Sequence, residues 1–253
     1  MTNSNGANNN NLDQAHLDFI STVSHELRTP LTSIRGFADT LLSSYEKLSP
    51  EQRKKFLYTI KDQSNRLIKL VENLLAVSKM QSEKEALVYK SVNVTPIIES
   101  CIQVIKSQYK THKFSLEVQE CIPFVLVDTD KLQQVLINLL DNAAKYSPEY
   151  SEIDVSVKQN NVEDKVQIKI RDRGIGILEE NIEKIFEKFS RIDSPLTRKI
   201  QGSGLGLFIT KNLIQKMNGK ISVFSNNEGS VFTVEFPIAS IDDTCLLKIK
   251  EQL

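Results

Sequence analysis

The chain has 253 residues, of which 40% are hydrophobic and 25% are charged. A chain of this length and composition can bury a sizeable core and is expected to form two domains. Its 32 Lys and Arg residues balance its 32 Asp and Glu residues, which excludes an overall basic field, and we expect no nucleic-acid partner. Three scattered cysteines fit a reducing compartment and disfavour a disulfide framework or a zinc site. No apolar run approaches the roughly 20 residues that cross a bilayer, so we expect a soluble, cytoplasmic piece without membrane contact.

Three segments lack a regular apolar period. Residues 1–11 are polar and low in complexity, which predicts a disordered lead or an artificial linker. Residues 83–91 gain charge and predict a linker, and residues 241–253 form a short amphiphilic tail to which no role is assigned. The expected domains are therefore residues 12–82 and residues 92–240.

Residues 12–82 are predicted to form a helical hairpin. Apolar residues recur at steps of three and four as far as residue 45, which is typical of a long amphipathic helix. Ser49 as N-cap, Pro50 at the first helical position and Gln52 completing a capping box predict a second helix that runs to about residue 81. Two antiparallel helices cannot bury two full apolar stripes between them, so we expect a homodimer with a four-helix bundle. The alternative is that the hairpin packs on the rest of its own chain.

The first helix contains the segment Ser24–Pro30, in which His25 is followed by Glu26 and then by Thr29. Residues four apart stack on one helix face, so the sequence sets an imidazole beside a carboxylate and one helical turn from a hydroxyl. These are the groups of a reactive site. The same residues also fit ordinary solvated helix positions.

Residues 92–240 alternate between helical and strand patterns. We expect helices at residues 94–109, 129–145, 178–189 and 205–217, and strands at residues 114–118, 124–127, 153–158, 166–171, 220–225 and 230–236. Interleaved helices and adjacent strand pairs predict a two-layer α/β sandwich, with one mixed sheet covered by helices. The whole chain is thus expected to be an α+β multi-domain protein.

Five of the 9 glycines fall in two clusters, Gly174 with Gly176, and Gly202 with Gly204 and Gly206. Glycine permits close backbone approach, and the second cluster opens into a predicted helix whose amide end suits phosphate. The spacing is not that of the dinucleotide fingerprint, because a leucine stands where the third glycine would fall. The clusters predict one ligand site with two rims, although each cluster alone also fits a tight structural turn.

The predicted helix at 129–145 carries Asn138 and Asn142 on one face among leucines. Asparagine is unfavourable in the interior of a helix, so the pair suggests side-chain oxygens that serve to bind a ligand. Asn142 would supply an oxygen to a Mg²⁺ ion that bridges phosphates, and Lys145 would offset phosphate charge. Asp172, at the end of a predicted strand, is an acceptor suited to the amino group of adenine.

Five motifs occur in a fixed order. They are Ser24–Pro30, Asn138–Asn142, the segment that begins at Asp172, Phe186–Phe189 and residues 202–206. Over about residues 14–238 the sequence resembles the catalytic core of the sensor histidine kinases of two-component signalling, in which these segments correspond to the phosphoacceptor box, the N box, the first glycine box, the F box and the second glycine box. The resemblance implies a dimerisation and histidine-phosphotransfer hairpin, followed by an ATPase domain of the gyrase and histidine-kinase superfamily.

The resemblance also implies an activity. His25 would take the γ-phosphoryl group of Mg-ATP, Glu26 would accept the ring proton, and the phosphoryl group would pass to an aspartate of a response regulator. Thr29 would orient water for dephosphorylation of that regulator. Residues 190–203 would form an ATP lid in which Arg191 reaches phosphate, while Arg198 and Lys199 either do the same or are solvated.

The ligands implied by the resemblance are ATP and Mg²⁺, with Asn142 as the metal ligand. The implied nucleotide-site residues are Asn138, Asn142, Lys145, Tyr146, Asp172, Gly174, Gly176, Arg191, Gly202, Gly204, Leu205 and Gly206. Sensor segments normally precede such a core, and none is present in this sequence, so any membrane anchor of a longer form would lie elsewhere. Two alternatives stay open, an ATP-driven conformational ATPase of the same superfamily and a non-catalytic signalling scaffold.

Overall fold

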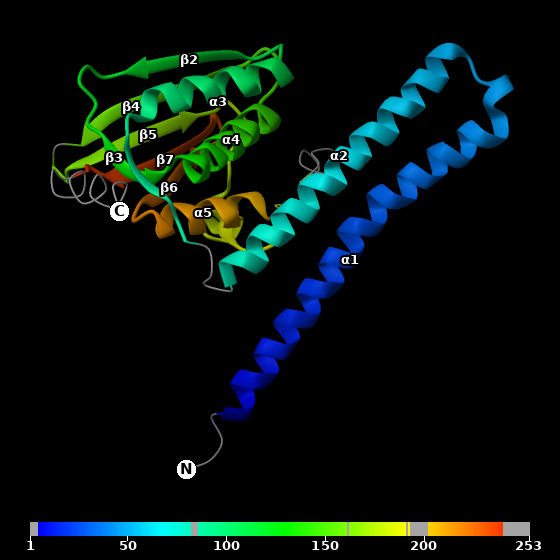
Figure 1. Ribbon diagram of the computed structural model, residues 1–253, viewed down its shortest axis with the longest axis horizontal. Coiled ribbons are helices and arrows are strands. Elements are labelled where there is room, and N and C mark those ends of the chain that lie inside the picture. Colours follow the sequence, from blue (N-terminus) through cyan, green and yellow to red (C-terminus); the bar gives the residue numbers. More distant parts are fainter. Residues whose placement is uncertain (1–4, 82–85, 161, 191, 193–201, 240–253) are drawn as a thin grey trace, which may run out of the picture. The chain divides into compact units, whose positions relative to one another are not determined.

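The structure is a computed structural model that describes residues 5–81, 86–160, 162–190, 192 and 202–239. The chain divides into two compact units, Met1–Ser78 and Lys79–Leu253. Figure 1 shows the long helices of the first unit and the mixed α/β architecture of the second. No helix within the described ranges is both long and apolar enough to cross a membrane.

The first unit is a helical hairpin. Helix α1 spans Asn5–Ser44, a 3₁₀ turn η1 spans Tyr45–Lys47, and helix α2 spans Pro50–Gln81. At the start of α2, the Gln52 amide donates to Ser49 Oγ at 3.2 Å and the Ser49 amide donates to Gln52 Oε1 at 2.8 Å. These reciprocal bonds confirm the predicted capping box, which satisfies two amides that the helix itself leaves unpaired.

The amino-terminal end of α1 differs from its prediction. The helix begins at Asn5, inside the segment whose composition predicted a disordered lead. Helix propagation costs less than nucleation, so a strongly amphipathic helix extends backward into residues that have no apolar stripe. The composition of residues 1–11 shows only that they lack an apolar stripe. It does not show that a helix that begins in the following residues can extend into them.

The second unit contains two sheets, three complete α-helices and two 3₁₀ turns among its described residues. Its elements are β1 (Tyr89–Val92), α3 (Val94–Gln108), β2 (Lys113–Val118), β3 (Val125–Asp128), α4 (Thr129–Tyr146), β4 (Glu152–Asn160), β5 (Lys165–Arg171), η2 (Glu179–Asn181), η3 (Lys184–Phe186), α5 (Gly206–Lys216), β6 (Lys220–Asn226) and β7 (Gly229–Pro237). The main sheet has the order β2-β4-β5-β7-β6, with β2 parallel to β4 and the other pairs antiparallel. The predicted mixed sheet is therefore confirmed.

One face of the main sheet is covered by helices, as Figure 1 shows for α3, α4 and α5. Along β4, Ile153, Val155 and Val157 are buried and alternate with half-exposed polar residues. This period of two is the pattern of a sheet with one packed and one solvated face. The helices thus form the second layer, and the core lies between the layers.

Strand β1 departs from the predicted secondary structure. β1 pairs with β3 in a separate antiparallel sheet, and three of its four residues fall within the predicted linker 83–91. The Tyr89 hydroxyl donates to the carbonyl of Lys216, the last residue of α5, and the Val88 amide donates to Asp128 Oδ2 at 2.9 Å. A strand this short does not show a readable alternation in sequence.

The helix predicted at 178–189 is wrong, because the structure has only the two 3₁₀ turns η2 and η3 there. Ile185 and Phe186 are the buried residues of these turns. Two buried side chains provide too little apolar face to repay the cost of nucleating a long helix. Phe189, at φ +60°, then turns the backbone away.

Candidate functional site

The predicted phosphoacceptor segment lies within α1, which continues through it without a break. His25 is exposed, and the Thr29 hydroxyl donates to the His25 carbonyl oxygen at 3.2 Å. This bond spans one helical turn, so the imidazole and the hydroxyl occupy neighbouring turns of one helix. The exposed ring is accessible to a bulky reaction partner.

Glu26 is held by the other helix of the hairpin. Its Oε2 lies 3.1 Å from Arg66 Nη2 of α2, and the two side chains are only 21% and 23% exposed. A half-buried pair of this kind is less screened by solvent than a surface pair. Arg66 thus fixes the carboxylate that stands next to His25 in sequence. Nothing in the sequence signals this partner, which lies 40 residues away.

In the second unit, helix α4 brings the other motifs together. Its start is capped by Asp128, whose Oδ1 accepts the amides of Asp130 and Lys131 at 3.1 Å. Near the far end of the helix, the Tyr146 carbonyl accepts the Ile175 amide at 3.4 Å, which seats the first glycine segment there.

The second glycine segment also meets α4. A Cβ atom added to Gly202 would lie 3.4 Å from Lys145 Nζ, and one added to Gly206 would lie 2.5 Å from Asn138 Oδ1. The N box therefore lies between the two glycine segments, as one site with two rims requires. Asn142 is half-buried on the turn between Asn138 and Tyr146.

Asp172 follows β5 and is 5% exposed. Its Oδ1 accepts the amides of Gly174 at 2.8 Å and Ser230 at 3.1 Å. Burial raises the pKa of this carboxyl, and the two backbone hydrogen bonds oppose that rise. Both of these bonds fall on one oxygen, so Oδ2 remains available to an amino group of a ligand.

Two glycines of these segments are explained by backbone packing. Gly176 has φ +71°, and a Cβ there would lie 1.9 Å from the Asn226 carbonyl oxygen at the β6–β7 turn. Gly204 has φ +67°, and a Cβ there would lie 2.6 Å from the backbone of Phe189. Any side chain would collide with main-chain atoms that cannot yield. The structural-turn interpretation thus accounts for both positions, whether or not they also contact a ligand.

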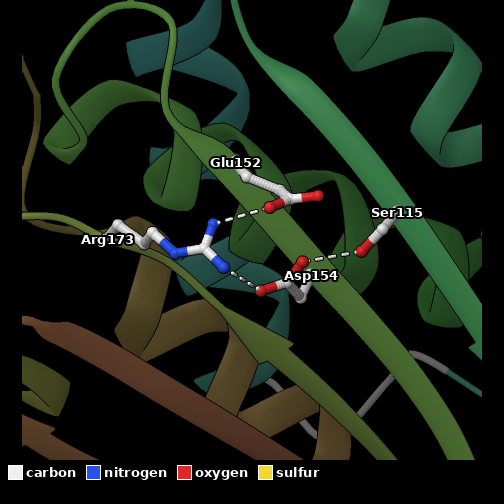
Figure 2. Close-up of polar contacts among 4 residues, drawn as sticks. All are labelled: Ser115, Glu152, Asp154 and Arg173. Atoms are coloured by element: carbon white, nitrogen blue, oxygen red, sulfur yellow. Dashed lines mark hydrogen bonds and ion pairs between the residues drawn. The ribbon is translucent and has the colours of Figure 1, made fainter.

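Arg173, between Asp172 and Gly174, turns to the outer side of the sheet. Its guanidinium donates to Glu152 at 2.9 Å and to Asp154 at 3.1 Å, both on β4, and the Ser115 hydroxyl donates to Asp154 at 2.7 Å (Figure 2). These groups are partly exposed, so they add little to stability. They tie the start of the glycine segment to β4 and β2. The Arg173 guanidinium is bonded to these carboxylates on the outer side of the sheet.

The F box meets α5 through two crossed cation–π contacts. Lys188 Nζ lies 5.2 Å from the centroid of the Phe208 ring, and Lys211 Nζ lies 5.3 Å from that of Phe186. Leu205 is fully buried, so its side chain belongs to the core and only its backbone can face a ligand. Arg191, Arg198 and Lys199 lie outside the described residues.

The oxygen donors present fit a Mg²⁺ ion that is bound largely through a ligand's phosphates. Within the described part of the chain, no three His, Cys, Asp or Glu side chains are grouped to hold a metal. Asn142 offers a neutral oxygen, and Mg²⁺ commonly takes one or two protein oxygens together with phosphate oxygens and water. The residues are thus suited to a metal that arrives with a nucleotide.

Fold and site together define a class of protein, in which a helical hairpin presents an exposed histidine and an α/β sandwich gathers an asparagine helix and two glycine segments. Family models match both parts. Residues 15–83 match the His Kinase A phospho-acceptor domain, and residues 127–240 match the histidine kinase-, DNA gyrase B- and HSP90-like ATPase. The chain belongs to the sensor histidine kinases.

Curated relatives align with both parts of the chain. The chain is 35% identical over 236 residues to the sensor protein kinase WalK of Staphylococcus haemolyticus, and 34% identical over 236 residues to that of Staphylococcus aureus. Each alignment covers 92% of this chain, but only 38% and 56% of the two relatives. The chain thus spans part of their length.

Solved histidine kinases share the fold. Histidine kinase ThkA in complex with the response regulator protein TrrA superposes with a TM-score of 0.70 at 27% identity, over 88% of this chain and 61% of that one. The histidine kinase AdeS of Acinetobacter baumannii gives a TM-score of 0.65 at 25% identity, over 85% of this chain and 98% of that one.

Proposed function

We propose that the chain is an ATP-dependent histidine kinase core that phosphorylates itself on His25 and passes the phosphoryl group to an aspartate of a response regulator. The observation that carries this proposal is the meeting of α4 with both glycine segments beside the buried Asp172, in a chain that also presents an exposed histidine. The similarity to WalK and to ThkA, which was solved with a response regulator, supports the same activity.

In the proposed phosphoryl transfer from ATP to His25, each of the site residues has a role. A ring nitrogen of His25 forms a bond to the γ-phosphorus as the bond from that phosphorus to the ADP oxygen breaks. The ring proton passes to Glu26, whose carboxylate Arg66 holds in place. Asp172 would accept a hydrogen bond from the adenine amino group, and Lys145 would lie near phosphate. When bound at Asn142, Mg²⁺ would neutralise phosphate charge.

The hairpin supports a homodimer. Its single-chain form leaves large apolar side chains exposed on both helices, among them Leu31, Leu57 and Leu75 at 53%, 59% and 56%. A second hairpin would cover such stripes in a four-helix bundle. His25 would then receive phosphate from nucleotide bound to its own chain or to its partner.

Incubation of the full chain with γ-labelled ATP and Mg²⁺ tests the proposal. A phosphohistidine kinase yields a covalent label that is stable to base and labile to acid. A conformational ATPase would release labelled phosphate without labelling the protein, and a non-catalytic scaffold would do neither. Either of these two results contradicts the proposed activity.

Replacing Arg66 by Gln is expected to slow autophosphorylation about tenfold, because a carboxylate that is no longer held in place is a poorer proton acceptor. The change should appear in kcat and leave the KM for ATP unaltered, since Arg66 belongs to the hairpin. Single-turnover labelling at saturating ATP measures it. Arg35→Gln on α1 removes an exposed arginine paired with Asp39 and serves as the matched control. Equal rates in the two variants would contradict a role for Arg66.

Replacing Thr29 by Ala is expected to slow dephosphorylation of a receiver domain at least about tenfold while autophosphorylation changes by less than about twofold, because only the first reaction needs an oriented water. The measurement follows loss of label from a receiver domain that this chain has phosphorylated. Thr29→Ser should retain the activity.

Thr40→Ala is the matched control for Thr29. Its hydroxyl also donates to the carbonyl four residues earlier, at 2.7 Å, on the same helix. If both alanine variants lost dephosphorylation equally, the lost intrahelical bond would explain the effect and Thr29 would have no role with water.

A further inference from the structure

The Asn138 side chain has a partner that the sequence pattern does not signal. Its Nδ2 donates to Thr210 Oγ1 on α5 at 2.8 Å, across 72 residues of sequence. The sequence predicts Asn138 as a ligand oxygen beside Asn142. The structure shows that its amide nitrogen also joins α4 to another helix.

Thr210 is an unusual residue for its position. It is 1% exposed, on a face of α5 whose other buried residues are Ile209, Leu213 and Ile214. A buried hydroxyl is costly unless it is hydrogen-bonded, and an asparagine within a helix is costly unless its side chain has a use. The Asn138–Thr210 bond accounts for both residues at once.

Gly206, the first residue of α5, completes the arrangement. A Cβ atom at this glycine would lie 2.5 Å from Asn138 Oδ1, so the carboxamide occupies space that only glycine leaves open. The carboxamide thus touches the first turn of α5 with one end and Thr210, one turn further along, with the other. The first turn of a helix carries the amides that no intrahelical acceptor satisfies.

We propose that Thr210 is a positioning residue of the nucleotide site. Through Asn138 it sets the distance and rotation between α4, which carries Asn142 and Lys145, and the amino end of α5. Thr210 itself touches no ligand and acts only through Asn138. This inference rests on the proposed function, because it assigns the residue to the ATP site of that function.

Calorimetric titration of the full chain with Mg-ATP tests the inference. Thr210→Val keeps the shape of the side chain but removes the acceptor, and is expected to weaken ATP binding about tenfold, because the unpaired carboxamide no longer holds the two helices in register. Thr210→Ser keeps the hydroxyl and should stay within about twofold of wild type.

Two further variants separate positioning from a general loss of stability. Ile214→Val also trims a fully buried side chain of α5, and should lower the melting temperature while leaving ATP affinity unchanged. In an Asn138→Ala background, Thr210→Val should weaken binding no further, because the residue through which it acts is gone.

Three results would overturn the inference. They are unchanged affinity in Thr210→Val, equal losses in the Val and Ser variants, and an equal loss in Ile214→Val. If wild type itself fails to bind Mg-ATP, the proposed function fails with it. If wild type binds and Thr210→Val binds equally well, only the positioning role is refuted.

Discussion

Replacing His25 by Gln is expected to abolish autophosphorylation, with a loss of at least about a thousandfold in covalent labelling. Glutamine keeps polarity and a good helix propensity, but its amide nitrogen is not a nucleophile. Because His25 is exposed and belongs to the hairpin, neither the fold nor ATP affinity should change. The measurement is the acid-labile label on the full chain, read together with ATP binding by calorimetry.

The chain offers a matched control on the same helix. His16→Gln makes the identical substitution in α1, outside the phosphoacceptor box, and should retain full labelling. If the label persists in His25→Gln and disappears in His16→Gln, the phosphoacceptor is His16 and the assignment of His25 is wrong. Loss of ATP binding in His25→Gln would show that the two units are not independent in this respect.

Replacing Asp172 by Asn is expected to weaken ATP binding about a hundredfold while the fold is retained, because a charged acceptor is replaced by a neutral group that can turn a donor toward the adenine amino group. Retention of the fold follows from geometry. The Asn carbonyl can accept the same Gly174 and Ser230 amides that Asp172 Oδ1 accepts. Asp154→Asn, on the outer side of the sheet, should bind ATP as wild type does. Equal affinity in the two variants would remove Asp172 from the site.

The pH dependence of Asp172 gives two trends of opposite sign. Burial raises its pKa in the folded state, so between the unfolded and folded pKa values the folded chain binds more protons. Stability then falls as pH rises through that window, and wild type should lose stability relative to Asp172→Asn. ATP binding needs the ionised form and should weaken as pH falls toward the raised pKa. A stability difference that is flat with pH would contradict the shift.

The sequence predicted those elements that are specified by residues close together in the chain. The capping box at Ser49 located the start of α2. The order of the boxes indicated one nucleotide site, and the contacts of Gly202 and Gly206 with α4 place those segments together. The roles assigned to the individual site residues stay predictions until they are tested.

Tertiary pairings could not be predicted in the same way. Arg66 and Thr210 meet their partners across 40 and 72 residues, and neither has a local signature. Gly176 illustrates an ambiguity of the sequence, because the Asn226 carbonyl oxygen already requires a glycine at this position, whether or not the glycine also contacts a ligand. The 178–189 helix failed for a related reason, since its apolar spacing does not reveal how few of those residues are buried.

The short strand β1 bears on where the ATPase unit can be cut from the chain. The family match to this unit begins at residue 127. Upstream of it, however, β1 pairs with β3, and the Tyr89 hydroxyl donates a hydrogen bond to a backbone carbonyl in the last turn of α5. The Val88 amide also bonds to the Asp128 carboxylate that caps α4. The smallest fragment that keeps both nucleotide-site helices capped therefore begins before residue 88, well upstream of the recognisable motif.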